Sequence, residues 1–383
     1  MRYVATIVFA FIIFQLSGQD SVEKGKKIFI TGYIKNLEAI SFEKNFREHI
    51  TSNLIHNRVN IKWKLSDNIM LALELRNRLF WGEEIKKTPG FVSFLRNENE
   101  KFNASVTWLN KSGIILHTNT ERLYLDYRKK NWNCRIGRQR VNWGVTTTWN
   151  PNDIFNSYNF LDFDYEERPG SDGVKFQYQH NEFSNTEMVF AHNGNNENTV
   201  GAVRYFLNRW NYDLQFITGW YNEHLTIGAG WAGNIKNAGF RGEIQYFVKT
   251  QDSTSHLNIT TEIDYVFKKG WYVNAGILFN KQGLNKKIDD WGKINLNLSI
   301  ENLMPTKWNF IAKINKEFTP LLSANFSTVY APGTNLLILL PGVTYNMATN
   351  LDVNLIWQSF FASINSSFEG VNHRCYIRLK WSY

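Results

Sequence analysis

The chain has 383 residues, a formal net charge of +9 at pH 7 and an aromatic content of 15%. Its two cysteines, Cys134 and Cys375, are too few to form a disulfide framework. No apolar run beyond the amino terminus approaches the ~18 residues that a transmembrane helix needs, which excludes a helical membrane protein. The basic balance fits three kinds of partner: nucleic acid, an anionic membrane surface or anionic solutes.

The amino-terminal segment has the pattern of a secretory signal peptide. Arg2 precedes the apolar run Val4–Leu16, and small residues follow it up to Gly18. A membrane anchor is the alternative, but this run is shorter than the ~20 residues of a spanning helix. We therefore expect a signal peptide over 1–19 and one mature domain over 20–383. An exported protein is not expected to bind nucleic acid.

The last stretch of the chain, His373–Tyr383, alternates strictly in character. Side chains alternate between the two faces of a strand. One face would be apolar and aromatic, and it carries Cys375, Ile377, Leu379, Trp381 and Tyr383. The opposite face would be polar and strongly basic, and it carries Arg374, Tyr376, Arg378, Lys380 and Ser382. A strand in the wall of a membrane barrel needs this pattern, because lipid covers one face and a polar lumen the other.

The same alternation recurs along the chain, with short turns alternating with long polar links. The clearest strands are predicted at His56–Leu65, Leu71–Leu79, Arg122–Arg128, Trp132–Arg140, Tyr212–Trp220, Phe240–Val248, Leu257–Phe267, Ile294–Ile300, Leu322–Tyr330 and Leu351–Trp357. The segment Gly82–Asn119 is predicted to be an extracellular loop with a short helix.

The pattern predicts an all-β fold, a transmembrane antiparallel up-and-down β-barrel. About 19 strands can be assigned, but a closed barrel with both ends in the periplasm needs an even number. One assignment is therefore expected to be wrong, between Gly270 and Lys316. We predict about 18 strands, with 16 as the alternative.

The predicted inward face of the first and last strands carries many cations. We name Arg58, Arg76, Arg78, Arg122, Arg128, Arg135, Arg374 and Arg378 the basic wall. Lys62, Lys64 and Lys380 share this face, and only Glu74 and Asp126 are expected to oppose it. The face could be a solvated surface, or the cationic wall of a pore that concentrates anions.

The densest motifs are GRQRVNWG (Gly137–Gly144) and WNPNDIFN (Trp149–Asn156), at the start of a long loop over Val141–Gly170. By its place after the fifth strand, this loop resembles the constriction loop of general porins. The resemblance assigns to the constriction Arg138, Arg140, Trp143, Trp149, Asp153, Asp162, Asp164, Glu166 and Glu167. The alternative is a loop packed on the barrel mouth with Trp143 and Trp149 as structural anchors. These two residues, with Tyr158 and Phe160, could also stack on sugar rings.

Together with RNRLFWGE (Arg76–Glu83), these motifs resemble porin-like outer-membrane β-barrel proteins of a poorly characterised Gram-negative family. The resemblance implies a location in the outer membrane and a role in transport, without naming a solute. The terminal strand, ending on aromatic Tyr383, resembles the signal that the barrel-assembly machinery recognises. Assembly machinery, outer-membrane lipid and small hydrophilic solutes are therefore the expected partners, and homo-oligomerisation stays open.

The sequence gives little support for an enzyme. Its eight histidines are scattered, and no GxSxG elbow, HExxH motif or paired-cysteine metal spacing is present. We therefore expect no catalytic residue, cofactor or metal. The expected function is a porin-like channel for passive diffusion of small hydrophilic solutes, with anion or sugar preference. The main alternative is a non-conducting scaffold, adaptor or adhesin, with a barrel enzyme less favoured. A barrel of ~16 to 18 strands favours the channel, because its interior is usually wide enough for water.

Overall fold

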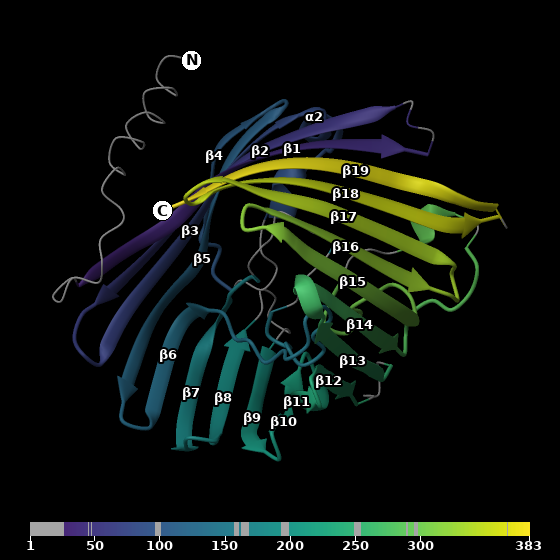
Figure 1. The fold of residues 1–383 in the computed structure, drawn as a ribbon. Helices are drawn as coiled ribbons and strands as arrows, with labels where there is room; N and C mark the ends of the chain where they lie inside the picture. Colours follow the sequence, from purple (N-terminus) through teal and green to yellow (C-terminus); the bar gives the residue numbers. More distant parts are fainter. Residues whose placement is uncertain are drawn as a thin grey trace.

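The protein is a single antiparallel sheet that curves into a ring (Figure 1). This computed structural model describes residues 27–383, apart from 45, 47, 96–100, 157–160, 162–167, 193–198, 249–253, 289, 295–297 and 366. The predicted signal peptide lies outside the described residues. The strands are β1 (Ile28–Glu43), β2 (His49–Lys64), β3 (Ile69–Gly82), β4 (Ser105–Lys111), β5 (Ile114–Lys129), β6 (Trp132–Gln139), β7 (Ser171–Asn181), β8 (Ser184–His192), β9 (Thr199–Arg209), β10 (Tyr212–Tyr221), β11 (His224–Ile235), β12 (Ala238–Phe247), β13 (His256–Val266), β14 (Trp271–Asn280), β15 (Trp308–Thr319), β16 (Leu322–Ala331), β17 (Leu336–Ala348), β18 (Leu351–Ile364) and β19 (Ser367–Ser382).

The ring closes between the first and last strands. Leu37 on β1 lies opposite Arg378 on β19. Beyond the end of β19, the backbone N–H groups of Gly32 and Tyr383 donate to each other's carbonyl oxygens, both at 2.9 Å. In the described part of the chain, β4 pairs with β5 alone, and the other strands follow one another around the wall. The wall is therefore an 18-strand up-and-down barrel, which confirms the predicted fold class and strand number.

The two faces of the wall differ in chemistry. On β11, Leu225 and Ile227 point outward and are exposed, whereas His224 and Thr226 point inward and are buried. Large apolar side chains such as Phe216 and Ile377, each more than half exposed, continue the outer face on other strands. Each described wall strand other than β4 has a partner strand on both sides, and an apolar outer face suits lipid. Among the described residues, no helix is long and apolar enough to cross a membrane.

The two ends of the barrel carry different connections. At the end where Tyr383 lies, β9 and β10 are joined by Trp210 and Asn211, both with positive φ angles of 57° and 62°. Two consecutive residues with φ above zero are typical of the tight turns that match the twist of a hairpin. The opposite end carries longer segments, as in outer-membrane barrels, where the short turns are periplasmic.

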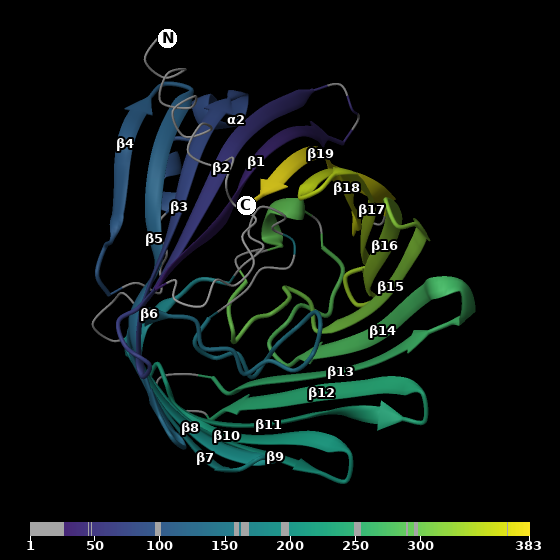
Figure 2. The same ribbon diagram turned by 60° about the vertical axis from the view of Figure 1, so that its left-hand side comes forward.

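Segments from this opposite end lie inside the ring (Figure 2). They are the link between β6 and β7 and the link between β14 and β15. Their buried apolar side chains, including Trp143, Phe155, Leu303 and Met304, form one cluster with inward residues of the wall such as Ile338. The helix α2 (Glu83–Lys87) and a 3₁₀ turn over Phe91–Leu95 form a second cluster against β1, β2 and β3.

Two sequence-based assignments are wrong. In Ile294–Ile300, the described residues are not strand, and Ile294 and Ile300 are buried. Both pack in the apolar cluster inside the lumen and do not face lipid. This wrongly assigned strand lies between Gly270 and Lys316, the interval in which one wrong assignment was expected. The segment Gly82–Asn119 contains the predicted short helix, but also β4 and the first residues of β5, which begins at Ile114 and not at Arg122.

Candidate constriction of the lumen

Most arginines of the predicted basic wall form ion pairs. Arg58 on β2 and Arg122 on β5 both contact the carboxylate of Glu74 on β3, and the Arg122 Nη1 to Glu74 Oε2 distance is 3.0 Å. Arg58 and Glu74 are buried, with 2% and 7% of their surface exposed. A buried charge must be paired, because removing it from water is costly. Glu74 therefore ties three adjacent strands together.

A register shift in β5 supplies an acidic residue that alternation did not predict. Glu74 lies opposite Arg122, but the next residue, Leu75, lies opposite Thr120. This bulge places both Glu121 and Arg122 on the inner face. Glu121 Oε1 lies 2.7 Å from Nε of Arg76, and both side chains are buried. The prediction that only Glu74 and Asp126 oppose the cations is therefore wrong.

The other arginines of β3, β5 and β6 also have local partners. Arg78 donates to the Leu95 carbonyl oxygen at 3.2 Å and to the Asn119 Oδ1 at 2.9 Å. Arg135 donates to Asp126 at 3.0 Å, while Arg128 is mostly exposed and lies 3.8 Å from the same carboxylate. This sector is therefore held together by its charges.

Arg138 lies on the wall and not in the predicted constriction. It is the penultimate residue of β6 and lies opposite Leu123, whose side chain points outward. It forms an ion pair of 2.9 Å with Asp172 on β7, which in turn accepts from the backbone nitrogens of Lys101 and Phe102. Side chains alternate between the two faces along β6. Because Gln139 points inward, its neighbour Arg138 lies on the outer face.

Glu243 on β12 holds the link between β6 and β7 inside the barrel through hydrogen bonds. This fully buried carboxylate accepts from the backbone nitrogens of Thr146 at 2.9 Å and Asn152 at 2.8 Å, and from the backbone nitrogen of Val145. Oγ1 of Thr146 and Nδ2 of Asn150 also donate to it. One wall side chain thus satisfies several donors of a loop that has no secondary structure of its own.

Further wall residues hold the same loop from neighbouring strands. Glu262 on β13 accepts from the backbone nitrogens of Thr147 at 2.9 Å and Thr148 at 3.0 Å. Gln215 on β10 donates to the Trp143 carbonyl oxygen at 2.6 Å. Gln215, Glu243 and Glu262 all occupy inward positions of strands whose side chains alternate between the two faces. This alternation is the only sequence signal that could have identified Glu243 and Glu262.

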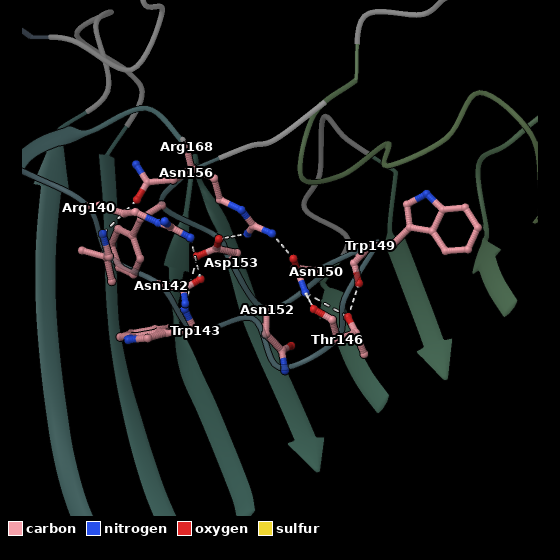
Figure 3. A network of polar contacts seen from close by, with 12 residues as sticks. Arg140, Asn142, Trp143, Thr146, Trp149, Asn150, Asn152, Asp153, Asn156 and Arg168 are labelled. Carbon is pink, nitrogen blue, oxygen red and sulfur yellow. Dashed lines mark hydrogen bonds and ion pairs between the residues drawn. The ribbon is translucent and has the colours of Figure 1, made fainter. Parts of the chain in front are cut away.

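Hydrogen bonds and an ion pair between its own residues also hold the loop together (Figure 3). Arg168 donates to Asp153 and to the Asn150 side chain, and Asp153 also accepts from the Trp143 backbone nitrogen at 3.2 Å. Burial and the nearby Arg140 lower the pKa of Arg168 to about 10, so it stays charged at neutral pH. Arg140 itself contacts the Asn142 side chain at the start of the loop.

Two of the four aromatic residues predicted to contact sugars, Trp143 and Trp149, are not accessible. Trp143 is 1% exposed and Trp149 is 2% exposed. Trp143 donates its indole N–H to Glu187 on β8 and packs edge-on against Phe155. Both tryptophans therefore act as anchors of the loop. The remaining predicted residues of this loop lie outside the described residues: Tyr158, Phe160, Asp162, Asp164, Glu166 and Glu167.

A cavity of about 370 Å³ separates the loop from the opposite wall. Thr147 and Thr148 form its loop side, and β15 to β19 form the rest. We call this space the lumen cavity; its polar lining is Thr147, Thr148, Lys313, Asn325, Ser327, Thr344, Asn354 and Arg378. Lys313 donates to Thr147 Oγ1 at 3.1 Å, and Arg378 donates to Asn354 Oδ1 at 2.9 Å.

The lumen cavity includes one member of the predicted basic wall, Arg378, and one cation that was not predicted as a site residue, Lys313. Arg374, the other wall arginine on β19, lines a second cavity of about 540 Å³ closer to the mouth, together with Arg78, Phe94 and Trp291. Within the described part of the chain, no three His, Cys, Asp or Glu residues are grouped so that they could hold a metal.

Comparisons with known proteins support this architecture. No protein-family model and no curated protein sequence matches the chain. Solved structures do match over nearly the full length. OccAB4 of Acinetobacter baumannii has a TM-score of 0.58 at 9% identity, covering 95% of this chain and 100% of its own. The outer membrane protein opdK of Pseudomonas aeruginosa has a TM-score of 0.57 at 8% identity, covering 93% of this chain and 98% of its own. At such low identity the likeness concerns the fold, and this chain has the fold of a porin-like outer-membrane β-barrel.

Proposed function

We propose that this protein is an outer-membrane channel for the passive diffusion of small hydrophilic solutes, narrowed by the loop between β6 and β7. The observation that carries the proposal is the lumen cavity between Thr147 and Thr148 on the loop and the polar inner wall of β15 to β19. A solute that crosses a barrel of this width must pass between the loop and that wall.

The charges around the lumen cavity favour anionic solutes. Lys313 and Arg378 line it, and none of its described lining residues is acidic. Two cations at a narrow place raise the local concentration of anions and orient dipolar solutes. The basic wall contributes in a different way: Arg58, Arg76 and Arg122 are bound to carboxylates, so their effect on passing ions is largely neutralised.

Neutral sugars are the second solute class that the lining fits. Asn325, Ser327, Thr344 and Asn354 present amide and hydroxyl groups to the cavity, and such groups can exchange hydrogen bonds with sugar hydroxyls. The aromatic stacking that sugar sites often use would have to come from residues other than Trp143 and Trp149, because both are buried.

A non-conducting scaffold is the alternative, and one observation favours it. The inserted segments bring a large apolar cluster into the barrel, where Trp149, Phe155 and Met304 pack against wall residues such as Leu278 and Ile338. This cluster fills one side of the interior.

The test is the conductance of the full mature chain, refolded and inserted into a planar bilayer. A channel gives stable current steps that scale with salt concentration. A scaffold gives no steps although the inserted protein is folded, as judged by its heat-dependent migration in gels.

A further inference from the structure

The outer face of the barrel changes from polar to apolar between two neighbouring rows of residues on β6 to β10. Outward residues of adjacent strands lie opposite one another and form such rows. The polar row is Arg138, Asp172, His192 and Thr199. The next row towards the short turns is Ile136, Val174, Phe190, Gly201 and Trp220. A change of this kind, with aromatic residues beside it, is typical of the boundary between lipid headgroups and acyl chains.

The apolar row is hollowed at Gly201 on β9. Its partners on the adjacent strands are Phe190 and Trp220, whose large side chains are 60% and 49% exposed. A Cβ atom at Gly201 would meet the Phe190 ring at 3.4 Å, an ordinary contact, so the glycine is not required by crowding. A cavity of about 400 Å³ lies here, and Phe190, Gly201, Met188 and Val203 are among its lining residues. Its mostly apolar lining suits an acyl chain.

A second cavity, of about 530 Å³, extends this hollow to the polar row. Val174 and Phe190 line both cavities, so the two are contiguous. The second cavity is also lined by Lys101, Arg138 and His192. We call the two cavities together the outer groove. It is apolar at the end near Gly201 and polar at the end near the mouth of the barrel.

The segment before β4 forms the rim of the outer groove. The backbone nitrogens of Lys101 and Phe102 donate to Asp172 at 2.9 and 3.1 Å. Arg138 donates to the Phe102 carbonyl oxygen and to the Thr120 carbonyl oxygen. These contacts hold residues 101–102 against the outside of β6 and β7, so the rim has a defined position.

The charges of the rim leave one cation in excess. The outer groove is lined by two cations, Lys101 and Arg138, and by one carboxylate, Asp172. Arg138 is 4% exposed and lies 2.9 Å from Asp172, so these two charges largely cancel. Lys101 is exposed, and its ammonium group forms no ion pair within the described part of the chain. A phosphate at the rim would therefore meet an unopposed positive charge beside an apolar groove.

We propose that the outer groove binds one molecule of lipid A, with a phosphate group at Lys101 and an acyl chain over Gly201. The rim lies at the end of the barrel that carries the long connections, which is the extracellular end in outer-membrane barrels. Lipid A, a phosphorylated disaccharide with several acyl chains, is the main lipid of the leaflet on that side of a bacterial outer membrane. Charge and shape therefore both favour this lipid.

Native mass spectrometry of the full mature chain in detergent micelles measures lipid binding directly. The probes are lipid A, lipid A with both phosphates removed, and phosphatidylglycerol. The natural protein should bind one lipid A about fivefold more tightly than the dephosphorylated form, because only the phosphate pairs with the ammonium group. Equal binding of these two forms would overturn the proposal. Phosphatidylglycerol binding as tightly as lipid A would overturn the choice of lipid.

A variant of the rim tests the place of the phosphate. Lys101→Gln should weaken the binding of lipid A about fivefold and leave the binding of the dephosphorylated form unchanged. Lys111→Gln is the matched control, because Lys111 is exposed at the end of β4 and does not line the outer groove. If Lys101→Gln and Lys111→Gln bind lipid A equally well, the phosphate is not at Lys101 and the proposal fails.

A variant of the hollow tests the place of the acyl chain. Gly201→Leu puts a side chain where the acyl chain would lie, and it should weaken the binding of both forms of lipid A by about fivefold. Ala275→Leu, at an exposed position of β14, is the matched control and should bind as the natural protein does. Unchanged binding in a folded Gly201→Leu barrel would contradict the assignment. Lys101→Gln changes an exposed side chain and serves if Gly201→Leu does not fold.

Discussion

The buried carboxylate of Glu243 on β12 accepts a 2.8 Å hydrogen bond from the backbone nitrogen of Asn152, in the middle of the long loop that lies inside the barrel. The same carboxylate also satisfies the backbone nitrogens of Val145 and Thr146. A loop without strands or helices would leave its N–H groups unpaired in a confined space, and the wall supplies the missing acceptors.

Removing this acceptor should release the loop. We expect Glu243→Ala to lower the free energy of unfolding by about 3 kcal/mol, because several buried donors lose their partner. The single-channel conductance should rise and become noisier as the loop leaves the lumen. Glu317→Ala, at an exposed position of β15, is the control and should change neither quantity. An unchanged conductance in a folded Glu243→Ala barrel would mean that this loop does not limit the current.

Neutralising the two cations of the lumen cavity should change ion selectivity. In Lys313→Gln with Arg378→Gln, the ratio of chloride to potassium permeability should fall by about twofold or more, because the local anion concentration depends on these charges. The reversal potential in a salt gradient measures this ratio. Lys316→Gln is the control, since its ammonium lies over the Trp271 ring and Lys316 does not line the lumen cavity. If the double variant and the Lys316→Gln control both give the reversal potential of the natural protein, the lumen cavity does not select ions.

Neutralising the carboxylates of the basic wall should affect stability first. Glu74→Gln leaves Arg58 and Arg122 without their shared partner, and we expect a loss of about 3–5 kcal/mol in unfolding free energy. Glu369→Gln removes a contact with the exposed Lys44 and should cost less than about 1 kcal/mol. Urea unfolding in lipid vesicles measures both. If Glu74→Gln and Glu369→Gln have the same unfolding free energy, the buried network contributes little to stability.

The buried tryptophans should support the loop without touching solutes. Trp143→Phe removes the indole N–H that binds Glu187, and we expect a loss of about 2 kcal/mol in unfolding free energy. If a panel of neutral sugars reduces the current of the natural channel, the variant should be blocked at the same concentrations. A weaker block in a stable Trp143→Phe barrel would point to direct contact and contradict the assignment.

Alternation between strand faces was enough to predict most of this fold, because each spanning strand must present an apolar side to lipid. It failed where a residue pattern has a different cause. Ile294 and Ile300 are apolar because they pack in the cluster inside the lumen. The segment containing β4 was predicted to be a loop. In the structure, its exposed Val106 and Trp108 belong to a strand that pairs with β5 beyond the end of β6.

The candidate site was less predictable than the fold. A period-two pattern identifies inward residues, but it cannot register the bulge that adds Glu121 to the inner face beside Arg122. It also cannot tell which inward acids bind an arginine and which bind a loop. Glu74 and Glu243 both occupy inward positions, and only the three-dimensional contacts separate their roles.

We propose that ions pass through the interior of this barrel beside the loop, by way of the basic lumen cavity. The most informative measurement is single-channel recording of the refolded mature chain across a tenfold salt gradient. We expect stable steps that scale with salt and a reversal potential on the anion-selective side. Silence from a folded, inserted barrel would contradict the channel, and clear cation selectivity would contradict the role of Lys313 and Arg378.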